Sequence, residues 1–267
     1  MKKYRGMSIL TSIGIAILAI ASLIILDAYG KSRRVYHQAG RLTDSYIEKI
    51  LVQTPGEAFT AWKDRGFTGR AVVYVAGEWA RLDNAYDAPV SRPYPLRLFR
   101  LSDRWAPAEL TSTNFLFSAT LNRIIRKISV ILPEDELKKV TDRARTTKDF
   151  QVNGDVLSFP YQGLQRRFTT SKGFKRESEP ALLYVSASYF RSKGPEELYQ
   201  NLVGTGLETD SIILCGDIED KNVTDAERDK LVRFAELIGW TPEPGATDDA
   251  GTIHNAQSVI LRQSRRI

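Results

Sequence analysis

The sequence predicts an α/β fold, and the segments after residue 180 indicate it most clearly. Short apolar runs alternate there with amphipathic segments of helical period, and polar or glycine-containing turns separate them. We expect strands over residues 181–189, 211–215 and 256–262, with helices over residues 194–203 and 224–238 between them. This β-α-β-α-β order is typical of a parallel sheet with right-handed crossovers.

A lobe of mixed α and β structure is expected before this parallel lobe. Asn153-Gly154 lies between two strand-like runs and is the strongest hairpin signal in the chain, because this pair favours the turns that join antiparallel strands. Pro133 is expected to open a helix, since a proline at the first helical position loses no hydrogen bond. The other expected elements are helices over residues 57–63 and 114–128 and strands over residues 70–75, 96–101, 128–132 and 164–170.

The segment that precedes these lobes is predicted to be helical. Apolar and aromatic side chains recur at helical spacing over residues 33–52, and Pro55-Gly56 is expected to end this helix. The predicted organisation is a basic N-terminal tail (1–6), a transmembrane signal-anchor (7–26), an amphipathic linker helix (27–54), a mixed α/β lobe with an antiparallel hairpin (55–175) and a parallel α/β lobe (176–267).

Residues 7–26 predict a single membrane span, because they form an apolar run without a charged side chain. A helix of this length is about 30 Å long, which matches the hydrocarbon core of a bilayer. Ala19-Ile20-Ala21 resembles the cleavage site of a signal peptide, which is the competing interpretation. The apolar run continues through residues 23–26, past the length of a signal's apolar region, and this favours an uncleaved signal-anchor.

The orientation of this span follows from its flanks. Residues 1–6 and 31–34 each contain three basic side chains, so the positive-inside rule separates the two orientations only slightly. A short basic N-terminus ahead of the first apolar segment favours placement of residues 27–267 outside the cytoplasmic membrane. In the opposite orientation, a membrane-tethered nucleotide sensor in the cytoplasm is the alternative.

The charge distribution argues against a nucleic-acid partner. The chain has a net charge of +6, of which residues 1–26 contribute +3, and the rest carries 35 basic and 32 acidic side chains. Residues 160–193 are mainly basic and residues 208–249 mainly acidic, which predicts either two solvated faces or a contact between them. A single cysteine, Cys215, excludes an internal disulfide framework, and two histidines leave little material for a histidine-rich metal centre.

Two strand ends are candidates for a site, since ligands of parallel sheets bind at the carboxyl ends of the strands. One end is Ser186-Ala187-Ser188, and the other is Cys215-Gly216-Asp217, followed by Glu219 and Asp220. Three carboxylates that converge on one point bind a hard cation or hold a proton through a shifted pKa. The alternative is an acidic loop without such a site, between a core strand and a capped helix. His254 lies before the last expected strand and is a second candidate for the same crevice.

The spacing Gly216-Asp217-x-x-Asp220 is similar to one metal-binding block of the calcineurin-like metallophosphoesterases. The strand-Gly-Asp order is also similar to a block of the endonuclease/exonuclease/phosphatase family. Both resemblances cover about ten residues. The first family also has an upstream Asp-x-His block, and His37 has no aspartate two residues before it. The second has a late Asp-His pair, whereas Ile253 precedes His254.

The function expected from these observations is that of a membrane-anchored extracytoplasmic binding or assembly subunit of an envelope complex, without its own catalysis and without a cofactor. Its partners would be the lipid bilayer, through residues 7–26, and a protein in the membrane. The alternative is a membrane-tethered hydrolase. Its catalytic candidates are Asp217 and His254, and a divalent metal would be held by Asp217, Glu219 and Asp220.

Overall fold

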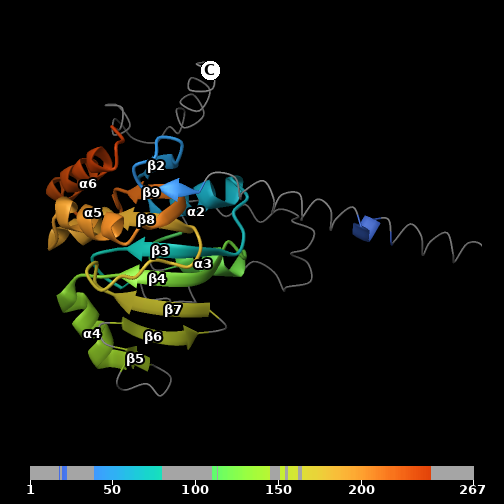
Figure 1. Cartoon of the computed structure of the whole chain (residues 1–267), viewed down its shortest axis with the longest axis horizontal. Helices are drawn as coiled ribbons and strands as arrows, with labels where there is room; N and C mark the ends of the chain where they lie inside the picture. Colours follow the sequence, from blue (N-terminus) through green and yellow to red (C-terminus); the bar gives the residue numbers. More distant parts are fainter. Residues whose placement is uncertain are drawn as a thin grey trace, which may run out of the picture.

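The structure is a computed structural model, and it describes residues 18, 20–22, 39–79, 110–112, 114–144, 151–153, 156–161 and 164–241. Within these ranges the chain forms an α/β domain built on one mixed sheet of nine strands (Figure 1). The strands are β1 (Gly40–Arg41), β2 (Glu48–Val52), β3 (Arg70–Val75), β4 (Ile125–Ile131), β5 (Gln151–Asn153), β6 (Val156–Tyr161), β7 (Leu164–Thr169), β8 (Ala181–Ser186) and β9 (Glu208–Cys215).

The strands follow the order β1-β9-β8-β3-β4-β7-β6-β5, and β2 also pairs with β9. The six strands β2, β9, β8, β3, β4 and β7 are mutually parallel, whereas β6 and β5 continue the sheet in antiparallel pairing. Every residue of β3 and of β8 is buried, as expected for central strands that are covered on both faces.

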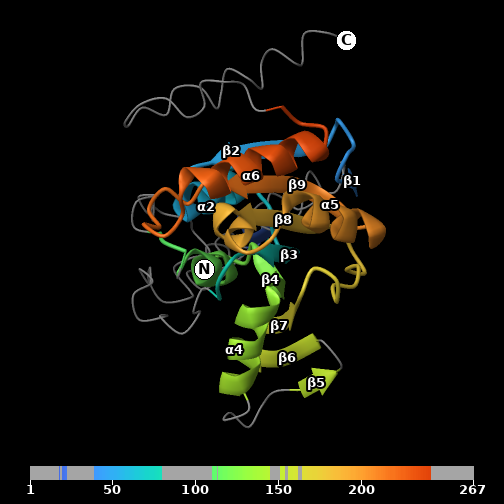
Figure 2. The same cartoon turned by 90° about the vertical axis from the view of Figure 1, so that its left-hand side faces the viewer.

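Helices cover both faces of this sheet. They are α2 (Pro55–Asp64), α3 (Phe115–Leu121), α4 (Glu134–Ala144), α5 (Pro195–Gly204) and α6 (Asp225–Leu237), with a short 3₁₀ helix, η4 (Ala187–Arg191). One core cluster packs α2 and α3 against one face of β3, and the other packs α5 and α6 against the opposite face. Figure 1 shows the two helix pairs on opposite sides of the strands, and Figure 2 is seen from the side of α5 and α6.

Local signals in the sequence account for several of these elements. Thr224 and Glu227 form the capping box expected at the start of α6. Pro195 is the first residue of α5, and the hairpin expected at Asn153-Gly154 is present, with Asn153 opposite Val156. The prediction of an α/β fold is confirmed, as are the strand at Arg70–Val75 and the parallel pairing of β8 with β9.

The helix predicted over residues 33–52 is wrong for the part that the structure describes. Gly40–Arg41 and Glu48–Val52 are strands, and both pair with β9. Pro55 does not end a helix but begins α2, whose N-cap is Thr54. The reason is long-range pairing: residues 48–52 lie beside Ser211–Cys215 of β9 and satisfy its outer backbone groups. Helical periodicity in the sequence cannot reveal such a pairing.

Two element boundaries also differ from the prediction. The helix expected over residues 114–128 ends at Leu121, and Arg123 has a positive φ of 59°, which turns the chain into β4. The strand expected over residues 181–189 ends at Ser186 and continues as η4, because the Ser186 side chain accepts a hydrogen bond from the Ser188 amide. Hydrophobicity alone predicts a longer strand, and this local hydrogen bond ends it at Ser186.

Strands from both predicted lobes lie in one sheet, because β8 and β9 insert between β2 and β3. The basic and acidic segments also meet, through the ion pairs Arg176–Glu208, at 2.8 Å, and Arg191–Asp220, at 3.8 Å. The predicted strands at residues 96–101 and 256–262 lie outside the described residues.

Most of the predicted membrane segment, residues 7–26, is also outside the described part of the chain, in which Leu18 and residues 20–22 are helical. None of the helices that the described residues form has both the length and the hydropathy needed to cross a membrane.

Candidate functional site

The connections of the sheet reverse direction between β3 and β8. The chain passes from β3 outward to β4, whereas it passes from β8 to β9 in the opposite direction. In open α/β sheets such a switch point leaves a crevice at the carboxyl ends of the two strands, where ligands bind. The residues that follow β3, β8 and β9 are therefore the natural candidates for a site.

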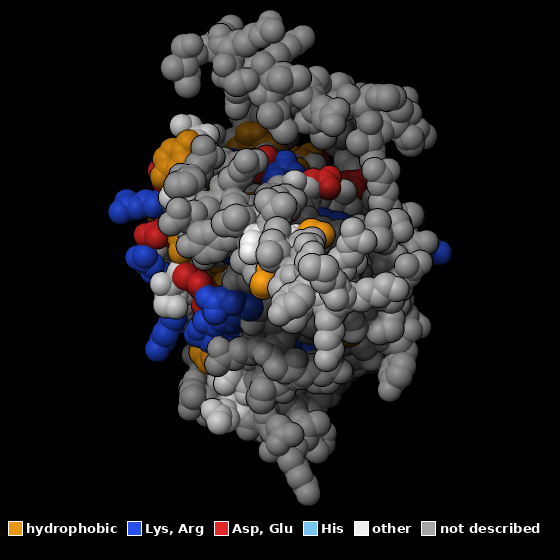
Figure 3. All heavy atoms as spheres, turned by 90° about the vertical axis from the view of Figure 1, so that its right-hand side faces the viewer, with side chains coloured by type: hydrophobic (Ala, Val, Ile, Leu, Met, Phe, Trp, Pro, Cys, Tyr) orange, Lys and Arg blue, Asp and Glu red, His pale blue; other side chains and the backbone are white. Residues whose placement is uncertain are grey.

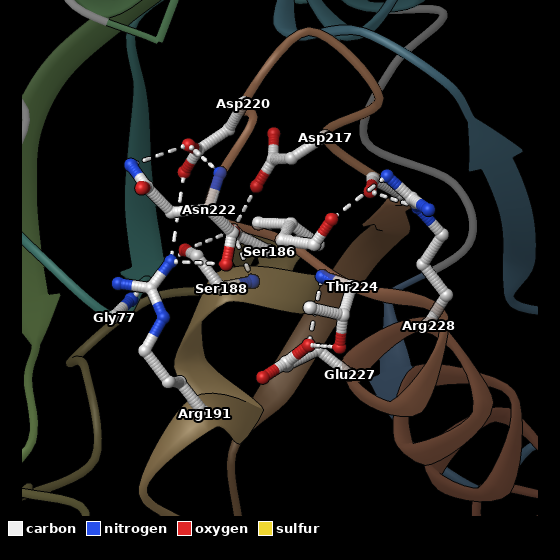
Figure 4. A network of polar contacts seen from close by, with 12 residues as sticks. Gly77, Ser186, Ser188, Arg191, Asp217, Asp220, Asn222, Thr224, Glu227 and Arg228 are labelled. Carbon is white, nitrogen blue, oxygen red and sulfur yellow. Dashed lines mark hydrogen bonds and ion pairs between the residues drawn. The ribbon is translucent and has the colours of Figure 1, made fainter.

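Polar groups from these three strand ends form a series of hydrogen bonds, which joins the Gly77 backbone amide to the side chains of Ser188, Ser186 and Asp217 (Figure 4). Ser186 ends β8 and donates its hydroxyl proton to Asp217, which follows β9. Ser188, on η4, lies with its hydroxyl 2.5 Å from that of Ser186. The Gly77 amide, after β3, donates to the Ser188 hydroxyl at 3.1 Å. We call Ser186, Ser188 and Asp217 the switch-point cluster.

The backbone at Gly77 explains how closely the chain after β3 approaches η4. A Cβ atom at this position would lie 2.1 Å from the carbonyl oxygen of Ser188, so only glycine fits. This contact brings the Gly77 amide within reach of the Ser188 hydroxyl. The sequence does not reveal it, because residues 77 and 188 are far apart along the chain.

Asp217 has an unusual backbone conformation, with φ at +48°. Aspartate tolerates this left-handed region better than most residues, yet the conformation persists only when its surroundings fix it. They do so here: the Gly216 amide donates to the Val52 carbonyl at 2.9 Å, and the Ile218 amide to the Gln53 carbonyl at 3.1 Å. The chain on both sides of Asp217 is thus attached to the end of β2.

Burial dominates the electrostatics of the cluster. Asp217 is 6% exposed, and the loss of water raises the pKa of its carboxyl above the ordinary value, although hydrogen bonds from Ser186 and Cys215 oppose the shift. The Cys215 thiol lies 3.1 Å from the second carboxyl oxygen. Burial raises the pKa of the Cys215 thiol and of the Tyr184 phenol well above their ordinary values, and the Asp217 charge adds to this effect. Cys215 is therefore an inert thiol, as its place in an apolar strand predicts.

A charged group flanks the cluster. Arg191, on η4, lies 3.8 Å from Asp220 and donates to the Asn222 carbonyl at 3.0 Å. The Asp220 carboxylate also accepts hydrogen bonds from the Asn222 amide and side chain. Figure 4 shows Arg191, Asp220 and Asn222 beside Ser188.

The acidic metal site predicted at Asp217, Glu219 and Asp220 is not assembled. Asp217 points into the domain toward Ser186, Glu219 is exposed, and Asp220 faces Asn222 and Arg191. Among the described residues, no group of three aspartate, glutamate, histidine or cysteine side chains could hold a metal ion. The three acids diverge because the turn at Asp217 directs successive side chains to different sides.

The structure places the two predicted strand ends together, through the hydrogen bond from Ser186 to Asp217. His254 lies outside the described residues, as does His37. Sequence reasoning named the strand end that holds Ser186 and Ser188 but did not connect it with Asp217. Gly77 was missed, and the only signal for it was a glycine directly after a buried strand.

The fold and the cluster define an α/β domain with a mixed sheet and a buried polar cluster at the switch point of its parallel strands. Searches with this chain against protein-family models, curated proteins and solved structures gave no match.

Proposed function

We propose that this chain is a membrane-anchored, single-pass subunit of an envelope complex, whose α/β domain lies outside the cytoplasmic membrane and binds a partner without catalysis of its own. The charge-free apolar run at residues 7–26 supports the anchor, and its basic flank supports the orientation. The β-α-β-α-β pattern of the sequence after residue 180 supports a further strand at residues 256–262 in the same domain.

The switch-point cluster carries the proposed binding role. It combines a buried carboxyl, two buried hydroxyls and a strained backbone at the edge where parallel sheets bind their ligands. Asp217 and Ser188 keep small exposed fractions, of 6% and 5%, so the cluster lies just below the surface. Next to it the Ile218 side chain is 53% exposed, which gives a partner an apolar contact beside the polar site.

A membrane-tethered hydrolase is the second candidate, and the hydrogen bond from Ser186 to Asp217 is the observation that favours it. A serine nucleophile must reach its substrate, whereas Ser186 is 2% exposed and its hydroxyl contacts Ser188 and Asp217. The binding role agrees better with this burial. A protein rather than a nucleic acid is the expected partner, because described acidic and basic side chains are interspersed on the face shown in Figure 3.

Photo-crosslinking in intact membranes tests the binding role. A photoreactive amino acid at position 218 lies at the carboxyl edge of the sheet, and one at position 46 lies just before β2, at the amino edge. The two native side chains are matched in exposure, at 53% for Ile218 and 55% for Tyr46. We expect a discrete crosslinked product from position 218 and not from position 46.

The same experiment in an Asp217→Asn background should weaken the product from position 218, because the partner binds at the cluster. Equal products from both positions, or none from position 218, would contradict the binding role of the carboxyl edge.

A further inference from the structure

We infer that the switch-point cluster is a magnesium site, in which the hydroxyls of Ser186 and Ser188 and the carboxylate of Asp217 are the protein ligands. This inference rests on the proposed binding role of the carboxyl edge and names the cofactor of that edge. It differs from the acidic site predicted from the sequence, because it uses one carboxylate and two hydroxyls from two neighbouring strands.

The chemistry and the spacing of these oxygens suit Mg²⁺. This ion prefers oxygen ligands at about 2.1 Å in an octahedron, so that neighbouring ligand oxygens lie about 3 Å apart. The hydroxyl oxygens of Ser186 and Ser188 are 2.5 Å apart, and Ser186 is hydrogen-bonded directly to the Asp217 carboxylate. A small opening of the cluster therefore brings the Ser186 hydroxyl to ligand spacing from both the Ser188 hydroxyl and the Asp217 carboxylate.

Each oxygen has a lone pair that the cation can use. The Ser186 hydroxyl donates its hydrogen bond to Asp217, so the Ser188 hydroxyl is the donor in the contact between the two hydroxyls. One lone pair of the Ser186 oxygen accepts a hydrogen bond from the Ser188 amide at 3.0 Å. The other lone pair becomes available to the cation when the Ser188 hydroxyl hydrogen rotates away from Ser186. Ser188 accepts one bond, from Gly77, and keeps its second lone pair.

The burial of Asp217 supplies the driving force. A carboxylate that is 6% exposed has lost most of its hydration, and the hydroxyl and thiol that contact it are neutral. The described cations beside the cluster contact other groups. Arg191 lies against Asp220 and the Asn222 carbonyl, and Arg228 donates to the Gly216 and Val223 carbonyls. A bound Mg²⁺ compensates the buried charge directly, which no neutral donor does as well.

The surroundings hold the ligands in place before any ion binds. Gly77 fixes Ser188, the attachments of Gly216 and Ile218 to the end of β2 fix the turn at Asp217, and Cys215 contacts the second oxygen of Asp217. Such second-layer contacts orient metal ligands and reduce the cost of ordering them.

Three protein oxygens leave half of an octahedron open. Water or an oxygen of the bound partner fills these positions, so the partner chemistry that fits is an acidic side chain or another oxyanion. The Mg²⁺ ion would thus join the domain to its partner at the switch point.

Thermal unfolding of the full chain in detergent, titrated with Mg²⁺ alone, tests this inference. Wild type is expected to gain about 5 °C in Tm, saturably, when Mg²⁺ reaches a hundredfold excess over Kd. Asp217→Asn should abolish the gain and Ser188→Ala should weaken it. Glu219→Gln is the matched control, because it removes the same charge from an exposed position two residues away and should keep the full gain.

Direct binding of Mn²⁺, measured by electron paramagnetic resonance and displaced by Mg²⁺, provides a readout that does not depend on how a variant folds. The magnesium site would be overturned if wild type bound no Mn²⁺. It would also be overturned if Ser188→Ala bound Mn²⁺ as well as wild type and Asp217→Asn gained as much in Tm as wild type. A crosslink from position 218 that persists in EDTA would overturn this inference while the binding role stands. Metal binding without any crosslink would overturn the binding role alone.

Discussion

Arg70→Met is expected to lower the free energy of unfolding by about 3–5 kcal/mol, because it leaves a buried charge without its counter-charge. Arg70 begins β3 and reaches past β8 to Asp210 on β9, with 2.8 Å between guanidinium nitrogen and carboxylate oxygen. Their side chains are 4% and 3% exposed. Urea unfolding of wild type and variant, compared at neutral pH, measures the loss.

The loss should depend on pH in a defined direction. Burial raises the pKa of Asp210 above its ordinary value, while Arg70 lowers it, so the variant's Asp210 has a still higher pKa. A carboxyl with a raised folded-state pKa contributes stability below its ordinary pKa and loses it as pH rises through the folded-state value. The deficit of Arg70→Met is therefore expected to shrink at acidic pH.

The double variant Arg70→Met/Asp210→Val is the control for this pair. It removes both charges and places an apolar residue in β9, so it should recover most of the stability lost in the single variant. A single variant that is as stable as wild type at neutral pH would show that the ion pair does not hold β3 and β9 together.

Trp62→Ala is expected to cost about 3–5 kcal/mol through the cavity that it opens. Trp62 lies on α2, is fully buried, and packs against Phe115 of α3 and Tyr184 of β8, with ring centroids 6.1 and 6.3 Å away. It is thus the side chain that joins two helices to one face of the sheet. Chemical unfolding measures the effect, and Asp64→Ala, at an exposed position on the same helix, should leave the stability unchanged.

Trp62→Phe separates packing from hydrogen bonding. Within the described residues the indole nitrogen is buried without a hydrogen-bond partner, so the loss of its N–H costs nothing and most of the packing remains. The phenylalanine variant should therefore stay much closer to wild type than the alanine variant. Equal losses in both would mean that the indole makes a polar contact essential to the fold.

The fold was predictable where local chemistry determines it. Proline at the first turn of α5, the capping box of α6 and the apolar run Ala71–Val75 of β3 are short-range signals, and the structure follows them. The strand β2 was predicted as helix because only its pairing with β9 makes it a strand. The place of β8 and β9 between β2 and β3 could not be predicted either, since strand order depends on contacts between distant segments.

The candidate site was predictable only in part for the same reason. The sequence predicts a site at Asp217 because Glu219 and Asp220 follow it closely, yet the side chains of these two acids face away from Asp217. Its hydrogen-bond partner Ser186 ends another strand, Ser188 contacts Ser186 from η4, and Gly77 follows a third strand. No spacing rule connects residues on three strands until the order of the strands in the sheet is known.

Placement of the domain relative to the membrane is the property on which the proposed function depends most. The most direct measurement fuses two reporters to residue 267 of the full chain, one active only outside the cytoplasmic membrane and one active only inside. We expect activity from the outside reporter and none from the inside one. Activity from the inside reporter alone would contradict the proposal and would place the switch-point cluster among cytoplasmic ligands instead of envelope partners.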